Sequence, residues 1–90
     1  MSWDSKWKIS YTPTAVDDLR NLPKNIQKRI VEKMRFFLLS GNPMKFSESI
    51  KDKSLGDFRF RIGDYRVLFD ITSGKMISVV NIKKRDKVYK

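Results

Sequence analysis

Three arginines interrupt an apolar pattern in the segment FRFRIGDYRVLFDI, which spans residues 58–71. Arginine stays protonated, and its forked N–H donors match the oxygens of a phosphate group. The basic segment KKRDKVYK follows at residues 83–90. Such a segment can neutralise backbone phosphates, and its tyrosine can stack on a base. These residue types predict a surface that binds an anion such as an RNA phosphate.

The arrangement of the arginines depends on the turn between two strands. A two-residue turn at Gly63-Asp64 would place Arg61 opposite Arg66. Alternation then puts the aromatic and aliphatic side chains on one face and Arg59, Arg61 and Arg66 on the other. Like charges facing each other across a ladder cost ~0.2–1 kcal/mol, and a bound phosphate would reverse that sign. Alternatively, the arginines extend into water or pair with Asp57 and Asp70.

The same alternation continues into the last strand. A second turn at Ser73-Gly74 predicts Asn81 beside Arg66 and Val79 beside Leu68. Asn81 would therefore share the face of the arginines, and the tail would extend it. The alternative is that the terminal lysines only improve solubility and that the tyrosine of the tail packs as a last core residue.

The amino-terminal half predicts one strand and two helices. WKISY, residues 7–11, alternates as a strand that could pair at either edge of the sheet. Thr12 or Thr14 is the expected N-cap of a short helix, with Pro13 near its first position. Asp17 and Asp18 are expected in its first turn.

The longer second helix should begin with Pro23 as its first residue, end at Gly41 and be stopped by Pro43. Its apolar stripe recurs at helical spacing; the members are Ile26, Ile30, Met34, Phe37 and Leu38. Residues 44–54 lack periodicity and predict a loop with a turn or short strand. The fold class is therefore α+β, in the order β-α-α-β-β-β, with a small, mainly antiparallel sheet and a two-helix hairpin on one face.

Composition limits the possible functions. Ninety residues form a single domain, 1–90, with a formal net charge of +10. Such a charge favours nucleic acid, an anionic membrane or an acidic protein as partner. The chain has no cysteine and no histidine, which excludes disulfides, zinc–imidazole sites and histidine-based triads. It has no apolar run of membrane-spanning length and no signal-peptide pattern, so we expect a cytoplasmic protein without a membrane partner.

Three stretches together resemble the RelE family of toxin–antitoxin toxins, within the RelE/ParE superfamily. They are YTPTAVDDLRNLPKNIQKRI, SLGDFRFRIGDYRVLFDI and KKRDKVY, and the match runs from about Tyr11 to Tyr89. The resemblance implies a RelE-like fold and an endoribonuclease that cuts mRNA on the ribosome. The reaction would need no metal or other cofactor: the ribose 2′-OH attacks the adjacent phosphate. A cognate RelB-like antitoxin would keep the toxin inactive, through an acidic or disordered segment.

The resemblance also implies roles for single residues. Arg66 matches the arginine that contacts the scissile phosphate, and Arg85 matches the one that stabilises the transition state or protonates the leaving group. Arg59 and Arg61 stand where some members carry lysines. Tyr89 matches the tyrosine that stacks on the mRNA base. The remaining expected RNA-binding residues are Lys51, Lys53, Asn81, Lys83, Lys84 and Lys87, of which Lys84 stands where many relatives have histidine.

The general base has two open readings. Arginine at position 61 is a poor base because its pKa lies above ~12. Glu48 looks like the glutamate that serves as base in the YoeB-like branch. The alternative for Glu48 is an exposed loop carboxylate with no part in the chemistry.

Two other functions remain open for the whole chain. ParE-type relatives share the fold but target DNA gyrase, and they typically lack part of the basic and tyrosine set present here. A degenerate toxin that only binds antitoxin or RNA is the third possibility.

Overall fold

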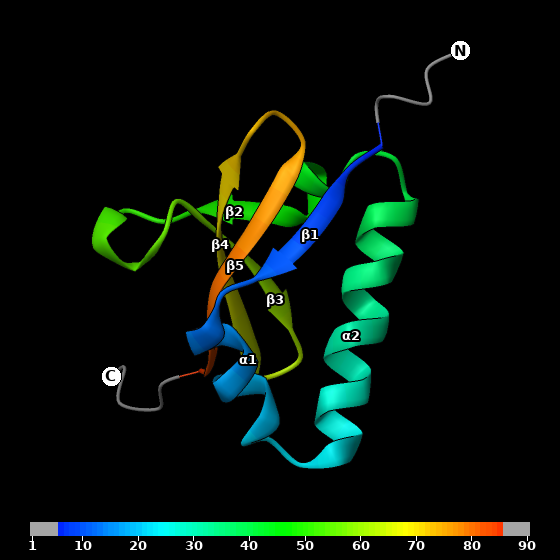
Figure 1. Cartoon of the computed structure of the whole chain (residues 1–90), viewed down its shortest axis with the longest axis vertical. Coiled ribbons are helices and arrows are strands. Elements are labelled where there is room, and N and C mark those ends of the chain that lie inside the picture. The colour runs from blue at the N-terminus through cyan, green and yellow to red at the C-terminus, as the bar shows by residue number, and fades with distance from the viewer. Residues whose placement is uncertain (1–5, 86–90) are drawn as a thin grey trace.

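The computed structural model describes residues 6–85 and has two helices on one face of a five-stranded sheet (Figure 1). The predicted α+β class is confirmed. Residues 44–54, which lack periodicity, contain an additional short strand, so the sheet has five strands. The elements are β1 (Lys8–Tyr11), α1 (Pro13–Arg20), α2 (Lys24–Leu39), η2 (Pro43–Phe46), β2 (Ser47–Ser49), η3 (Lys53–Leu55), β3 (Phe58–Ile62), β4 (Tyr65–Thr72) and β5 (Met76–Lys84). The strand order is β1-β5-β4-β3-β2.

All strand pairs are antiparallel except β1 with β5. Because β1 and β5 run parallel, the chain must cross over between them, and the two helices form the first part of this crossover. β1 thus lies at the edge beside β5, which settles its place in the sheet. Neither helix of the described chain is long and apolar enough to cross a membrane.

The helix boundaries follow local signals, with two corrections. Thr12 is the N-cap of α1, and its hydroxyl oxygen accepts a hydrogen bond from the Ala15 N–H. The first turn contains no acidic residue, so the expectation for Asp17 and Asp18 was wrong. Pro23 is the N-cap of α2 rather than its first residue.

The core lies between α2 and the sheet and is built around stacked phenylalanine rings. Phe37 of α2 stacks on Phe60 of β3, and Phe60 stacks on Phe69 of β4, each with ring centroids 4.5 Å apart. Phe46 and Phe58 extend the stack at its two ends, at 4.9 and 5.7 Å. Contacts of this kind add to the stabilisation from burial alone. The stack therefore ties the long helix to the strands that carry the arginines.

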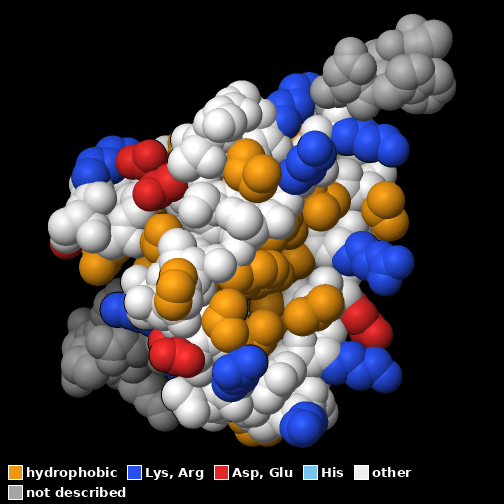
Figure 2. All heavy atoms as spheres, viewed as in Figure 1, with side chains coloured by type: hydrophobic (Ala, Val, Ile, Leu, Met, Phe, Trp, Pro, Cys, Tyr) orange, Lys and Arg blue, Asp and Glu red, His pale blue; other side chains and the backbone are white. Residues whose placement is uncertain are grey.

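An apolar hollow remains beside this core. Figure 2 shows hydrophobic side chains gathered between β1 and α2, with lysines and arginines along the outer edge of α2. A hollow of about 340 Å³ there is lined by Trp7, Leu38 and Leu39, together with Lys6 and Gly41. Leu39 is 78% exposed. We call this the β1–α2 groove.

The turn between β3 and β4 has two residues, as predicted. Gly63 has a φ of +58°, and Asp64 does not have positive φ, the pattern of a type II′ turn. Arg61 lies opposite Arg66, and Ile62 lies opposite Tyr65. The predicted division into an apolar face and a face with the arginines is confirmed; we call the latter the arginine face.

The predicted register of β5 was wrong by two residues. Lys83, not Asn81, pairs with Arg66; Asn81 pairs with Leu68. Val79 pairs with Phe69 on the core side. There are two causes: three residues separate Thr72 from its partner Met76, and the register shifts again between Leu68 and Phe69. That second shift leaves Val80 as an extra residue in β5, a bulge that keeps Asn81 and Lys83 on the arginine face.

α1 closes the edge of β5 where β1 ends. The Asp18 carboxylate accepts hydrogen bonds from the Ile82 N–H at 2.9 Å and from the Asn81 amide at 3.1 Å. Earlier along the same edge, the Thr12 N–H donates to the Val79 carbonyl at 3.0 Å. The helix thus takes the place of a neighbouring strand along this part of β5.

Candidate functional site

Among the described residues, the arginine face carries four basic side chains and the carboxylate of Glu48, with Asp70 further along β4. Arg59 and Arg61 come from β3, Arg66 from β4 and Lys83 from β5. Glu48 pairs with Arg59 across the short antiparallel ladder between β2 and β3, so it lies on the same face. The residues come from four adjacent strands because each strand contributes every second side chain to a face.

Glu48 reaches the arginines directly. Its Oε1 accepts a hydrogen bond from Arg59 Nε at 3.0 Å and lies 2.9 Å from Arg59 Nη2. The same oxygen lies 3.4 Å from Arg61 Nε. Of the two aspartates considered as partners from sequence, Asp70 accepts a hydrogen bond from the Asp57 N–H at 2.8 Å. The acid that pairs with Arg59 and Arg61 is therefore Glu48.

These contacts lower the pKa of Glu48. The hydrogen bond from Arg59 is the largest cause; burial, the next largest, raises the pKa, and attraction to Arg61, Arg59 and Arg66 lowers it further. The lowered pKa keeps the carboxylate ionised at neutral pH. A carboxylate with a lowered pKa is a weaker base than an ordinary one.

The two cross-strand arginines open into a small notch. It has a volume of about 80 Å³ and is lined by Arg61, Gly63, Asp64, Tyr65, Arg66 and Arg85. We call it the arginine notch. Pockets for drug-sized ligands hold about 300–1,000 Å³, so this notch suits a group the size of a phosphate rather than a whole nucleoside.

The backbone holds Arg85 at this notch. The Arg85 N–H donates to the Asp64 carbonyl at 2.6 Å, just after the end of β5. The β3–β4 turn thus binds the beginning of the basic tail. Arg61, Arg66 and Arg85 come from three separate segments and meet at one point.

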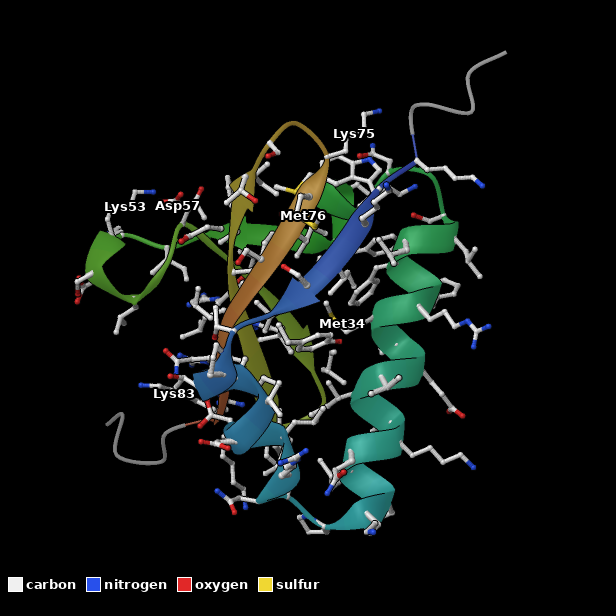
Figure 3. All side chains as sticks on the ribbon, viewed as in Figure 1. Met34, Lys53, Asp57, Lys75, Met76 and Lys83 are labelled. Atoms are coloured by element: carbon white, nitrogen blue, oxygen red, sulfur yellow. The ribbon has the colours of Figure 1, made fainter. Side chains whose placement is uncertain are left out.

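The other predicted RNA-binding residues are more dispersed. Lys51 and Lys53 are exposed in the loop between β2 and β3, and Figure 3 shows Lys53 far from Lys83. Lys84 pairs with Tyr65, so it falls on the opposite face from Arg66. Asn81 is held by Asp18. Lys87 and Tyr89 lie outside the described residues.

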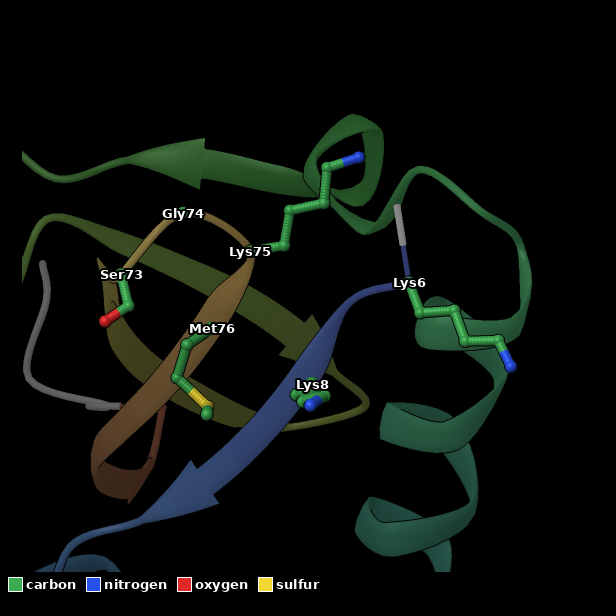
Figure 4. Close-up of a pocket in the computed structure, with 6 residues that line it drawn as sticks. All are labelled: Lys6, Lys8, Ser73, Gly74, Lys75 and Met76. Carbon is green, nitrogen blue, oxygen red and sulfur yellow. The ribbon is translucent and has the colours of Figure 1, made fainter. Parts of the chain in front are cut away.

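A second group of basic residues lies at the other end of the sheet. Lys6, Lys8 and Lys75 border a hollow with Ser73, Gly74 and Met76. Their side chains point in different directions (Figure 4), and Lys75 Nζ lies 5.7 Å from the centroid of the Trp7 ring. Among the described residues, the arginine notch is therefore the better-converged site for an anion.

Sequence reasoning missed three contributors to this region. Asp64 was identified only as a turn residue, yet its carbonyl anchors Arg85, and Tyr65 lines the notch. Asp18 orients Asn81 from a helix far away in the sequence. Only the turn signal at Gly63-Asp64 could have identified the anchor, because the contact of Asp18 is purely tertiary.

Comparison with known proteins gives one consistent family. A sequence model described as the ParE toxin of the type II toxin–antitoxin system parDE matches residues 9–89. Toxin RelE of Mycobacterium tuberculosis is 32% identical over 91 residues, which cover 100% of this chain and 93% of that protein. Toxin RelG of the same organism is 28% identical over 85 residues, covering 93% and 97%.

Solved structures show the same relationship. The toxin–antitoxin complex RelBE2 from Mycobacterium tuberculosis contains a chain with a TM-score of 0.72 and 27% identity, covering 89% of this chain and 99% of that one. The archaeal RelE–RelB complex from Pyrococcus horikoshii gives a TM-score of 0.70 and 25% identity, covering 92% and 99%. Both neighbours were solved as complexes of a toxin with its antitoxin.

Proposed function

Because the chain belongs to the RelE/ParE superfamily of type II toxins, we propose that it is a ribosome-dependent endoribonuclease that cuts translated mRNA. The observation that carries this proposal is the arginine notch. Arg61 and Arg66 face each other across one ladder, and Arg85 is held beside them by the turn. Such a site can hold a phosphodiester from several sides.

The main contribution that the protein makes to this reaction is the stabilisation of negative charge. Attack of the 2′-oxygen forms a bond to phosphorus, and the bond from phosphorus to the 5′-oxygen breaks. The 2′-OH loses its proton, and the departing 5′-oxygen gains one, leaving a 2′,3′-cyclic phosphate and a 5′-OH. Negative charge builds up on the phosphoryl oxygens in between. Arg61 and Arg66 are placed to stabilise that charge, an effect worth about 10²–10³ in rate for one donor.

The first test is primer extension on a translated mRNA with ribosomes and purified protein. We expect cuts in wild type and a loss of about 10²–10³ in rate for Arg66→Ala, because a donor to the phosphoryl oxygens is removed. Lys8→Ala, which also removes one positive charge but lies away from the notch, should cut like wild type. A lane without ribosomes should show no cuts.

Two results would contradict the proposal. Full cleavage by Arg66→Ala would separate the arginine face from the chemistry. The matching family model is described as a ParE toxin. Absence of cuts by folded wild-type protein would therefore point to the ParE-like alternative considered from the sequence, binding of DNA gyrase. A supercoiling assay with purified gyrase then distinguishes that function from a toxin that only binds its antitoxin.

The proposal includes a cognate antitoxin as partner. The solved neighbours are RelB–RelE complexes. The β1–α2 groove is apolar and has basic residues beside it, which suits an amphipathic segment with acidic residues that folds on binding. A second acidic stretch on the arginine face would block the notch, and the two sites together would account for inhibition.

A further inference from the structure

Arg59 and Arg61 differ in how they use their guanidinium groups. The Arg59 side chain is 23% exposed and directs both Nε and Nη2 to one oxygen of Glu48. The Arg61 side chain is 61% exposed and contacts Glu48 through Nε alone. A guanidinium has five N–H donors, and the contact of Arg61 with Glu48 involves only its Nε, so its Nη groups are able to face the notch.

Glu48 is placed between charges that would otherwise repel one another. Arg59 and Arg61 lie two positions apart on one strand, and Arg66 lies across from Arg61. Four basic side chains, including Lys83, occupy this small area. A fixed carboxylate at its border offsets that repulsion, and it restricts the rotamers of two long side chains before any phosphate arrives.

The same geometry makes Glu48 a poor proton acceptor. Its Oε1 oxygen already accepts a hydrogen bond from Arg59 and lies close to Arg61. Taking a proton from a ribose hydroxyl would weaken both contacts. The carboxylate is also on the edge strand β2, whereas the arginine notch is lined by β3, β4, their turn and the end of β5.

We propose that Glu48 is a positioning residue, which fixes Arg59 as a structural support and orients Arg61 toward the arginine notch. This inference rests on the proposed function for its catalytic consequence. It departs from the role of general base that the family resemblance suggested for Glu48. It also separates the two arginines of β3: Arg61 contacts the phosphate, and Arg59 acts through Glu48.

Replacement by glutamine distinguishes positioning from base catalysis. The amide oxygen of Glu48→Gln can still accept from Arg59, although with about half the strength of a charged acceptor. We expect kcat to stay within about tenfold of wild type in Glu48→Gln and to fall about 100-fold in Glu48→Ala, because misplacement of a distant group can cost that much. If Glu48 were the base, both variants would lose about 10²–10⁴ in kcat. Equal loss in both variants would overturn the proposal.

A double-mutant cycle provides the second readout. If Glu48 acts by orienting Arg61, adding Glu48→Ala to Arg61→Ala should cause little further loss of kcat. Multiplying losses would overturn the proposal. The pH profile of kcat should keep its shape in Glu48→Gln. A profile that changes from flat to rising with pH would mean that a base had been removed.

Arginine NMR tests the positioning without any cleavage. We expect the Nε–H signals of Arg59 and Arg61 to shift in Glu48→Ala and to remain in place in Glu32→Ala, a matched carboxylate removal on α2. Unchanged signals in Glu48→Ala would overturn the positioning role. If wild type cuts no mRNA but the signals shift, the proposed function fails and the positioning role stands.

Discussion

At the scale of single residues, the carboxylates of this chain hold its basic and backbone groups in place. Glu48 contacts two arginines, and Asp18 satisfies a strand N–H that β1 does not reach. Both are remote in sequence from the groups that they hold. The contribution of each contact to stability can therefore be measured by a substitution.

Asp18→Ala should destabilise the fold. Ile82 is buried, and its N–H would lose its acceptor. Leaving such a donor unsatisfied costs about 1–3 kcal/mol. Urea unfolding should show this decrease in the free energy of unfolding. Asp17→Ala, an exposed neighbour on the same helix, should have almost no effect, and equal stability of both variants would contradict the assigned contact.

Glu48 makes stability depend on pH in the acid range. Its pKa is lower in the folded protein than in the unfolded chain, where a glutamate titrates near about 4.3. The contribution is therefore present above the unfolded pKa and is lost as pH falls through the folded pKa. We expect wild type to be more stable than Glu48→Gln at pH 7 and the difference to vanish in strong acid. A difference that grows on acidification would have the wrong sign.

At the scale of elements, the loop between β2 and β3 is held against the sheet by an unusual glycine. Gly56 is buried, with φ +130° and ψ 172°, a region that other residues rarely adopt. The next residue, Asp57, donates its N–H to the Asp70 carboxylate and to the Phe69 carbonyl. This pairing fixes where β3 begins and thus where its arginines lie.

Gly56→Ala should cost about 1–3 kcal/mol of unfolding free energy, because alanine must adopt a strained backbone there. A new Cβ would meet Val80 and Asp70 only at ordinary contact distances, so strain rather than collision is the cause. Gly74→Ala is the control: its φ is +70° with nothing within 4 Å, and about 1–2 kcal/mol is expected. Thermal unfolding measures the loss of stability in both variants. A Gly56→Ala variant as stable as wild type would contradict the assigned backbone strain.

The elements also show what the sequence alone can predict. Turn chemistry at Gly63-Asp64, the cap at Thr12 and the spacing of α2 are local, and each predicted its element. The register of β5 was wrong because a longer turn and the bulge at Val80 depend on packing against β4. The pairing of β2 with β3 is likewise non-local, so the contact of Glu48 with the arginines was invisible from sequence. Positions on strands and the cross-strand partners within the β3–β4 hairpin were predictable, but the partners of β5 and β2 were not.

At the scale of the whole molecule, a net charge of +10 surrounds a small core. Lysines and arginines lie on the arginine face, along α2 and at the β4–β5 turn. A surface of this kind attracts anionic partners over about a Debye length, roughly 10 Å at 0.1 M salt. Association should therefore respond to salt as well as to shape.

Binding of the antitoxin should weaken as salt rises from about 0.05 to 0.5 M, because screening removes the attraction between opposite charges. Titration calorimetry at several salt concentrations measures the affinity. Leu39→Ala in the β1–α2 groove should reduce affinity by a similar factor at every salt concentration, since it removes only apolar contact. Affinity independent of salt would mean that the basic surface takes no part.

The closure of β5 by α1 has a consequence for how this protein behaves at high concentration. An uncovered strand edge is a template on which another chain can add a strand, and that is a common route to aggregation. Here Thr12 and Asp18 occupy the backbone groups of β5 that extend past β1. By accepting a hydrogen bond from the Ile82 N–H, Asp18 should prevent a strand of another chain from pairing there. Its removal should make light scattering rise with protein concentration before the fold itself is lost.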